Sequence, residues 1–240
     1  MHVAGILETI LRERQQYLIY LAISGVVLAL TAIGYFFNPL LFQPYLGRIH
    51  PVLVFLVVIL VGALVLAFLL SRGPWAIRSA LPLRDLLPFF GLVPLFALVA
   101  IAVDLKVGFA ADINVALPLS LAFYPAIAFL VEIVFHVVPL ALILLVVDSL
   151  FKGMGRDTAI WIAIALVALA EPIFQTLAAR SARPFPLWAT VLVAVNILLI
   201  NVTQLAVFRR DGFLSMYAFR LAYYSIWHIL WGYLRLKILF

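Results

Sequence analysis

Apolar residues form long runs along this chain, and short segments between the runs hold most of the charged side chains. A run of roughly 20 apolar residues is what a helix needs to cross a bilayer. The pattern predicts seven such helices, with eight as the alternative. The expected spans, in chain order, are 17–37, 51–70, 86–103, 115–147, 158–179, 187–208 and 213–240.

The fourth run, 115–147, is too long for one straight crossing. Because it contains Pro118, Pro125 and Pro139, we expect either kinks or a separate shallow segment at its start. Asp104 is expected in the surface loop that precedes it.

The N-terminal segment has a different pattern. Apolar side chains recur at helical spacing between residues 3 and 16, with charged residues on the opposite face. This pattern predicts an amphipathic helix in the membrane interface over residues 1–16, followed by a single transmembrane domain over 17–240.

Composition supports a membrane protein. Of the 240 residues, 68% are hydrophobic and 11% are charged, whereas soluble domains are about a quarter charged. Alternation of polar and apolar residues, which a membrane β-barrel requires, is absent. We therefore predict an all-α, polytopic transmembrane helical bundle whose first partner is the lipid bilayer.

Charge and cysteine content narrow the chemistry. The net charge is +6, but Lys and Arg lie mostly in loops and at helix ends, where they set topology and contact anionic headgroups, so no nucleic-acid partner is expected. There is no Cys, which excludes disulfides, thiolate metal sites and a thiol nucleophile.

Loop charge predicts the orientation. With seven spans, the N-terminal side holds nine basic residues and the opposite side six. The nine are Arg12, Arg14, Arg72, Arg78, Arg84, Lys152, Arg156, Arg209 and Arg210. The positive-inside rule then places the N-terminus in the cytoplasm, and we expect a prokaryotic inner (cell) membrane.

Ionisable residues inside the spans are the candidate site. Glu132 and His136 are four residues apart and so share one helix face. Helical rise places His136, Glu171 and His228 at a similar depth of about 20 Å from the basic face, with Glu132 at about 25 Å. Buried ionisable groups usually mark function, so these four are the predicted catalytic set.

Further polar residues could support this set. Arg220, Tyr224 and His228 recur every four residues on the last span. Arg220 is expected either beside the carboxylates or extended toward the basic face. Asn201, with Asn196 and Gln204, could line a polar cavity.

Several chemistries fit these groups. Two carboxylates and two imidazoles suit general acid–base catalysis on a water molecule. The same set, Glu132, His136, Glu171 and His228, could bind zinc or iron. A His could also ligate haem or a pigment in a subunit of a larger membrane complex. A transporter would use Glu132 and Glu171 as proton or ion sites, and the simplest alternative is hydrogen bonding between packed helices.

At these residues the chain resembles the CPBP family of intramembrane glutamic proteases, which includes the Abi, CAAX-protease and bacteriocin-processing proteins. Its first motif, Glu-Glu-x-x-x-Arg with Phe before the Arg, corresponds to residues 131–136. Glu132 and Phe135 match the motif, whereas Val131 and His136 replace the first Glu and the Arg.

The other two family motifs match in spacing. Phe-x-x-x-His falls on 167–171, with Glu171 at the His position. His-x-x-x-Asn falls on 228–232, with His228 kept and Gly232 at the Asn position. The turn at 209–213 also resembles the one before the family's last motif. The resemblance covers residues 120–232.

The resemblance implies a peptidase site acting on membrane-associated peptides, with no required cofactor. Glu132 would belong to the water-activating pair, and His228 would help to hold the oxyanion. The substitutions predict a divergent member with altered or lost activity, and some family members serve binding or immunity roles.

Overall fold

The computed structural model describes residues 3–78, 83–151, 153–179 and 185–240, and all regular structure in these ranges is helical. The α-helices are α1 (Val3–Arg12), α2 (Arg14–Phe37), α3 (Gln43–Leu46), α4 (Pro51–Leu70), α5 (Leu87–Phe90), α6 (Leu92–Val107), α7 (Ser120–Val131), α8 (Val138–Leu150), α9 (Arg156–Ala168), α10 (Ala170–Ala179), α11 (Leu187–Asp211), α12 (Phe213–Tyr224) and α13 (Gly232–Ile238). The prediction of an all-α fold is confirmed.

Four shorter helical turns interrupt or connect these helices. Two are 3-10 turns, at Leu83–Asp85 and Ala111–Ile113. Two are π-helical, at Glu132–Val137 between α7 and α8, and at Ser225–Trp231 between α12 and α13. Each π-helical turn contains one of the predicted site histidines.

Six helical segments in the described ranges are long and apolar enough to cross a bilayer: Arg14–Phe37, Pro51–Leu70, Leu87–Val107, Ser120–Leu150, Arg156–Thr176 and Leu187–Asp211. They correspond to the first six predicted spans, with ends shifted by a few residues. The predicted seventh, 213–240, forms the continuous run of α12, a π-helical turn and α13 but is not among the six. Polar and aromatic residues dilute its apolar character.

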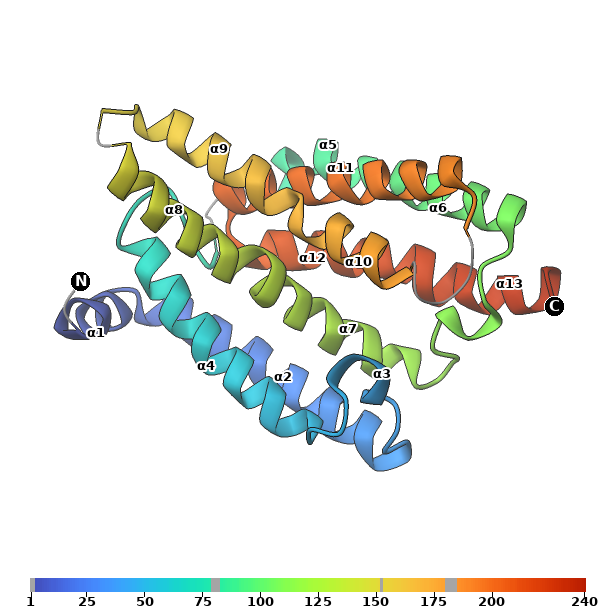
Figure 1. The fold of residues 1–240 in the computed structure, drawn as a ribbon. Coiled ribbons are helices and arrows are strands. Elements are labelled where there is room, and N and C mark those ends of the chain that lie inside the picture. Colours follow the sequence, from blue (N-terminus) through green and yellow to red (C-terminus); the bar gives the residue numbers. More distant parts are fainter. Residues whose placement is uncertain (1–2, 79–82, 152, 180–184) are drawn as a thin grey trace.

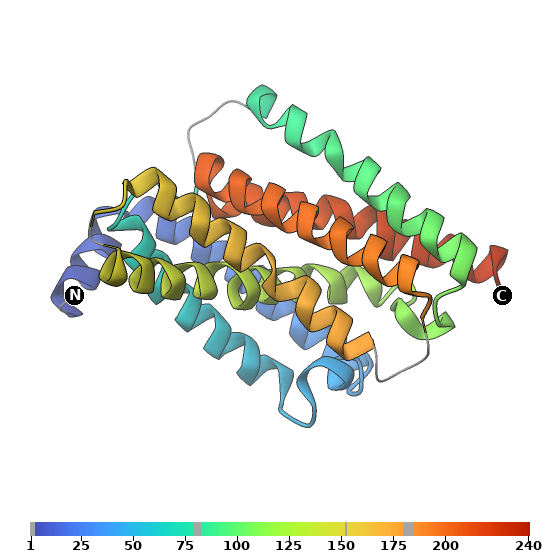
Figure 2. The same ribbon diagram turned by 45° about the horizontal axis from the view of Figure 1, so that its top comes forward.

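The long helices run side by side, with the N-terminus and C-terminus at opposite ends (Figures 1 and 2). Helices α2 and α4 lie on one side of the combined rod of α7 and α8. Helices α11 and α12 lie on the other side, and α6 covers α11. The rod of α7 and α8 is therefore central to the bundle.

The long run at 115–147 does not divide into two membrane segments. Its helix begins at Ser120 and continues to Leu150, with the π-helical turn at its centre. Of the two alternatives, kinks or a separate shallow segment at the start of the run, the structure has no separate helix there: residues 115–119 are non-helical and lead directly into the long helix.

Close contact joins α2 to α4. The hydroxyls of Tyr17 and Tyr20 donate hydrogen bonds to the carbonyls of Ala63 (3.0 Å) and Ile59 (2.8 Å). Both tyrosines are buried, so these bonds satisfy hydroxyls that would otherwise be unpaired in an apolar core. Gly62 lies between the two acceptors and has no side chain to separate the helices.

The position of Asp104 differs from the surface loop expected from the sequence. It lies within α6, fully buried, rather than in a surface loop. Both of its oxygens are bound by the equally buried Arg235 of α13, at 2.7 and 3.0 Å, and Trp231 Nε1 donates to it at 2.7 Å. Its burial is tolerated because an opposite charge and further hydrogen bonds compensate it.

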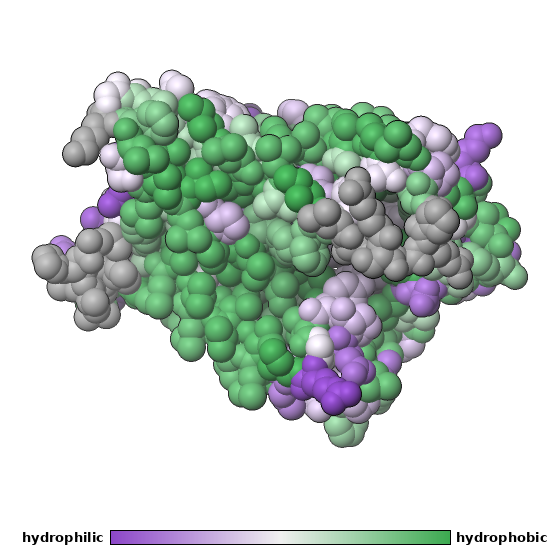
Figure 3. Space-filling model, in the orientation of Figure 1, coloured by the Kyte–Doolittle hydropathy of each residue, from purple (hydrophilic) through white to green (hydrophobic). Residues whose placement is uncertain are grey.

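The outer surface matches a lipid environment. In Figure 3 the face toward the viewer carries a broad hydrophobic band, and hydrophilic residues gather toward its ends. Large apolar side chains on several spans are exposed, including Leu60 (64%) and Leu98 (60%). Such a continuous apolar surface indicates an integral membrane protein.

Candidate functional site

The Glu132–His136 pair lies in the π-helical turn of the central rod. Both side chains are fully buried, and His136 Nδ1 is 2.9 Å from Glu132 Oε2. A π-helical turn widens the backbone spiral and is frequently found at functional sites. The predicted contact between Glu132 and His136 is therefore present.

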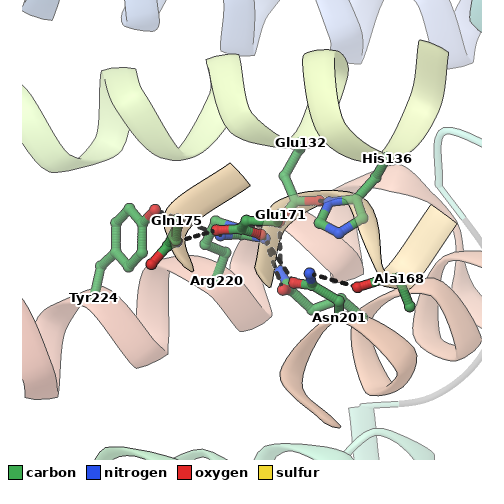
Figure 4. A network of polar contacts seen from close by, with 9 residues as sticks. Glu132, His136, Ala168, Glu171, Gln175, Asn201, Arg220 and Tyr224 are labelled. Carbon is green, nitrogen blue, oxygen red and sulfur yellow. Dashed lines mark hydrogen bonds and ion pairs between the residues drawn. The ribbon is translucent and has the colours of Figure 1, made fainter. Parts of the chain in front are cut away.

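Arg220 of α12 lies at the centre of the site and binds both glutamates (Figure 4). Its NH1 and NH2 donate to the two oxygens of Glu171, at 3.1 and 3.0 Å, while its Nε donates to Glu132 Oε1. Planar guanidinium groups match carboxylates in this two-bond geometry. Arg220 does not extend to the basic face; its side chain is 3% exposed.

Two amides of α11 complete the contacts around Arg220. Gln204 donates its Nε2 to Glu132 Oε1 and accepts from Arg220 NH2 at 2.9 Å. Asn201 Oδ1 lies 3.5 Å from the same NH2, and its Nδ2 donates to the carbonyl of Ala168 at 3.2 Å. The predicted supporting role of Asn201 thus corresponds to a contact beside Arg220 and not to a cavity wall.

Two residues extend the network along α10 and α12. Gln175 Nε2 donates to Glu171 Oε1 at 3.0 Å. Tyr224 Oη lies 3.4 Å from Arg220 NH1, a long hydrogen bond. Asn196 lies elsewhere and donates to the carbonyl of Phe96 at 3.1 Å.

The carboxylates are fully engaged. Each of the four oxygens of Glu132 and Glu171 accepts at least one hydrogen bond from another side chain. One guanidinium faces two carboxylates, so its positive charge cannot by itself balance them. The only other ionisable side chain in contact with these carboxylates among the described residues is His136, whose Nδ1 lies 2.9 Å from Glu132 Oε2.

One atom of the site is left without a partner. His136 Nε2 is buried and makes no hydrogen bond in the part of the chain that the structure describes. Buried polar atoms nearly always have partners, so an unpaired one points to a function, a bound water or a protonation role. Among the described side chains that contact Glu132, Glu171 or Arg220, it is the one buried polar atom without a hydrogen-bond partner.

His228 is not part of this network. Its Nδ1 lies 2.8 Å from Asn114 Oδ1, and its ring stacks on Tyr124 at 4.6 Å. Tyr124 and Glu132 are eight residues apart on the rod, so the two groups are separated by about 12 Å along it. Glu132 faces Arg220, and His228 lies two turns further along the C-terminal run.

The predicted metal site is not assembled. Across the described residues, no group of three or more His, Asp or Glu side chains is arranged to hold a metal ion. Glu132, His136 and Glu171 are near one another, but Arg220 lies between the carboxylates, and His228 contacts Asn114 instead.

Sequence reasoning missed three contacts: Gln175 with Glu171, Asn114 with His228, and Asp104 with Arg235. Gln175 lies four residues after Glu171, a spacing that could have indicated its contact. Asn114 and the Asp104–Arg235 pair join segments more than 100 residues apart, and no local pattern signals them.

Comparisons of the chain with protein-family models, with curated proteins and with solved structures gave no match. The fold and the geometry of the site therefore carry the functional argument.

Proposed function

We propose that the chain is a CPBP-like integral membrane protein in which the glutamic-protease site has become a closed ion-pair network, so that the protein binds a membrane component and does not cleave peptides. The observation that carries this proposal is Arg220, which binds both Glu132 and Glu171 inside the bundle.

A glutamate that activates water needs an oxygen within hydrogen-bond reach of that water. Arg220 and Gln204 occupy Oε1 of Glu132, and His136 occupies Oε2. The side chain is also fully buried. These contacts favour a network that holds helices together over one that hydrolyses a substrate.

The comparison with the CPBP motifs supports the same conclusion. The residues at the first and second motif positions, Glu132 and Glu171, lie close together, because both bind Arg220. The third motif supplies His in the family, yet the residue that meets the glutamates is Arg220 and not His228. An arginine cannot serve as a general base or as a neutral proton donor at ordinary pH.

The proposal includes a topology of seven spans with a cytoplasmic N-terminus. The continuous run of α12 and α13 lies beside α11, and the termini lie at opposite ends, as an odd number of crossings requires (Figure 1). Helix α1 would lie in the membrane interface, and the membrane would be a prokaryotic cell membrane. Because the chain has no Cys, single Cys substitutions report topology directly.

We expect G153C to react with a membrane-impermeant thiol reagent from the cytoplasmic side only, and D112C from the opposite side only. Both positions lie in exposed turns. Labelling of both from one side would contradict the topology without affecting the argument on Arg220.

A cleavage assay tests the loss of hydrolysis. The protein in lipid nanodiscs is incubated with a pool of hydrophobic peptides, and products are counted by mass spectrometry. We expect the same peptide profile for the wild type, for Glu132→Gln and for the exposed control Glu8→Gln. A product that forms with the wild type and the control but not with Glu132→Gln would overturn the proposal.

A second candidate function, acid–base catalysis by His136, rests on its unpaired Nε2. Glu132 would then orient His136 through Nδ1, as the carboxylate does in a catalytic triad. The two candidates differ in the same assay, because His136→Gln would abolish any cleavage that His136 performs. If no cleavage occurs in the wild type, this candidate fails.

A further inference from the structure

A second cluster of polar and aromatic side chains surrounds His228, which lies on the π-helical turn Ser225–Trp231. Asn114 follows the 3-10 turn Ala111–Ile113, so it approaches from the segment between α6 and α7. Tyr124 stacks on the imidazole at an interplanar angle of 21°, and Tyr224 meets it edge-on, with ring centroids 4.7 Å apart. Asn114 and Tyr124, from two other segments, therefore fix the ring of His228 together with Tyr224, one turn earlier on the same helical run.

Gly232 gives Asn114 room to reach this ring. A Cβ atom at Gly232 would lie 3.0 Å from both Cβ and Nδ2 of Asn114, which is tighter than ordinary contact. The missing side chain therefore lets Asn114 pack against α13 while its Oδ1 contacts His228.

The hydrogen bonds around Asn114 have a defined direction. The backbone N–H of Val115 donates to Tyr124 Oη at 2.8 Å, so the hydroxyl proton of Tyr124 is free to donate onward to Asn114 Oδ1, at 3.4 Å. Oδ1 is an acceptor, and so Nδ1 of His228 is the donor in their 2.8 Å contact. In neutral His228 the lone pair is then on Nε2.

This lone pair is available, unlike that of His136. His228 is half-buried, and no side chain or backbone group in the described ranges bonds its Nε2. His136 Nε2 is also unpaired, but its side chain is fully enclosed. Of the two intramembrane histidines, only His228 presents an accessible ligand atom.

We propose that His228 Nε2 is an axial ligand for a metal ion carried in a planar macrocycle of the haem type, dissolved in the membrane. Metal-binding histidines commonly donate their other ring N–H to a carbonyl or carboxylate, which is the role of Asn114 Oδ1 here. No further His, Asp or Glu completes a site for a bare ion among the described residues. A macrocycle fills the remaining coordination positions itself.

Two further aromatic residues make the surroundings of His228 apolar. Trp227 lies beside the imidazole, with centroids 5.9 Å apart, and Phe109 packs edge-on against Trp227 at 5.7 Å. This inference rests on the proposed function, since it names the component that the non-hydrolytic protein binds.

Haemin titration in nanodiscs tests the inference by the shift of the Soret band. We expect one equivalent to bind to the wild type, with the shifted band absent in His228→Ala. Asn114→Leu should weaken binding by about tenfold or more, the usual effect of losing such a supporting hydrogen bond. Asn114→Asp, which keeps an acceptor at this position, should bind at least as tightly as the wild type.

The control is His50→Ala, at an exposed loop histidine that stacks on Tyr35. It should leave the Soret shift unchanged. No shift in the wild type, an equal shift in His228→Ala, or loss of the shift in His50→Ala would overturn the inference. If His228→Ala fails to fold, the opposite effects of Asn114→Leu and Asn114→Asp still decide it.

The peptide assay on the same preparations separates the two proposals. Cleavage that depends on Glu132 would contradict the loss of hydrolysis, whatever the spectrum. Absence of both cleavage and a Soret shift would overturn only the macrocycle ligand.

Discussion

The guanidinium of Arg220 meets the carboxylate of Glu171 in two parallel hydrogen bonds, with NH1 3.1 Å from Oε1 and NH2 3.0 Å from Oε2. The pair joins α12 to α10 inside the bundle, where both side chains are almost fully buried. Because the Nε of Arg220 also binds Glu132, a single cation holds three helical segments together.

Arg220→Met should therefore destabilise the protein strongly. It keeps an apolar side chain of similar length but leaves two buried carboxylates without their cation. We expect a loss of about 3–5 kcal/mol in the free energy of unfolding, the usual effect of removing one partner of a buried ion pair. Denaturant unfolding in detergent micelles, followed by circular dichroism, measures it.

Arg72→Met is the matched control. The Arg72–Asp148 pair has a similar distance of 3.0 Å, but its side chains are 37% and 43% exposed. Exposed pairs contribute about 0–1 kcal/mol. Equal losses in the two variants would show that the burial of the Arg220 pairs has no energetic weight.

The two carboxylates should act non-additively. Glu171→Gln leaves Arg220 paired with Glu132, and Glu132→Gln leaves it paired with Glu171, so each single variant keeps one opposite charge beside the cation. The double variant leaves the guanidinium buried with no counter-charge. We expect its loss in unfolding free energy to exceed the sum of the single losses by about 1 kcal/mol or more.

The same unfolding assay measures all three variants. A sum that equals the double-variant loss within about 0.5 kcal/mol would mean that the two carboxylates bind Arg220 independently. In that case the charge argument for the closed network would fail.

Sequence patterning predicted the helical class and the first six spans because apolar run length is a local property. It also predicted the contact of Glu132 with His136, since residues four apart share a helix face. It left open whether Arg220 lies beside the carboxylates, and it could not show that His228 lies apart from them. That depends on how α7 and α12 are shifted along one another, which side-chain packing decides.

The burial of Asp104 and Arg235 was missed for a related reason. Each lies near the end of an apolar run, where charged residues usually reach the membrane surface. Their pairing needs α6 and α13 to meet, and these helices are 131 residues apart at the contact. Composition and spacing carry no signal for such a contact.

Asp104→Asn tests the importance of this second pair. The substitution leaves Arg235 buried without its counter-charge, although its guanidinium still donates to the carbonyls of Ala110 and Phe109. We expect α13 to open more readily, and amide hydrogen exchange at residues 232–238 should become at least tenfold faster.

The control is Asp112→Asn, at an exposed position in a nearby 3-10 turn. Its exchange rates in α13 should match those of the wild type. Unchanged protection of α13 in Asp104→Asn would mean that other packing holds this helix in place.

Gly62 is expected to be intolerant of even one methyl group. A Cβ at this position of α4 would overlap the hydroxyl of Tyr20 and lie 2.8 Å from Cδ1 of Ile133, in the π-helical turn beside Glu132. Gly62→Ala should therefore disrupt the hydrogen bond from Tyr20 to Ile59 or displace the site turn, at a cost of about 1–3 kcal/mol.

Gly25→Ala is the matched comparison, because Gly25 lies inside α2 and its Cβ would meet no atom within 4 Å. Alanine is the better helix former, so Gly25→Ala should leave stability unchanged or raise it by up to about 1 kcal/mol. Thermal unfolding of the two variants side by side decides the matter: the close approach of α4 to the site turn requires that only Gly62→Ala lowers the midpoint.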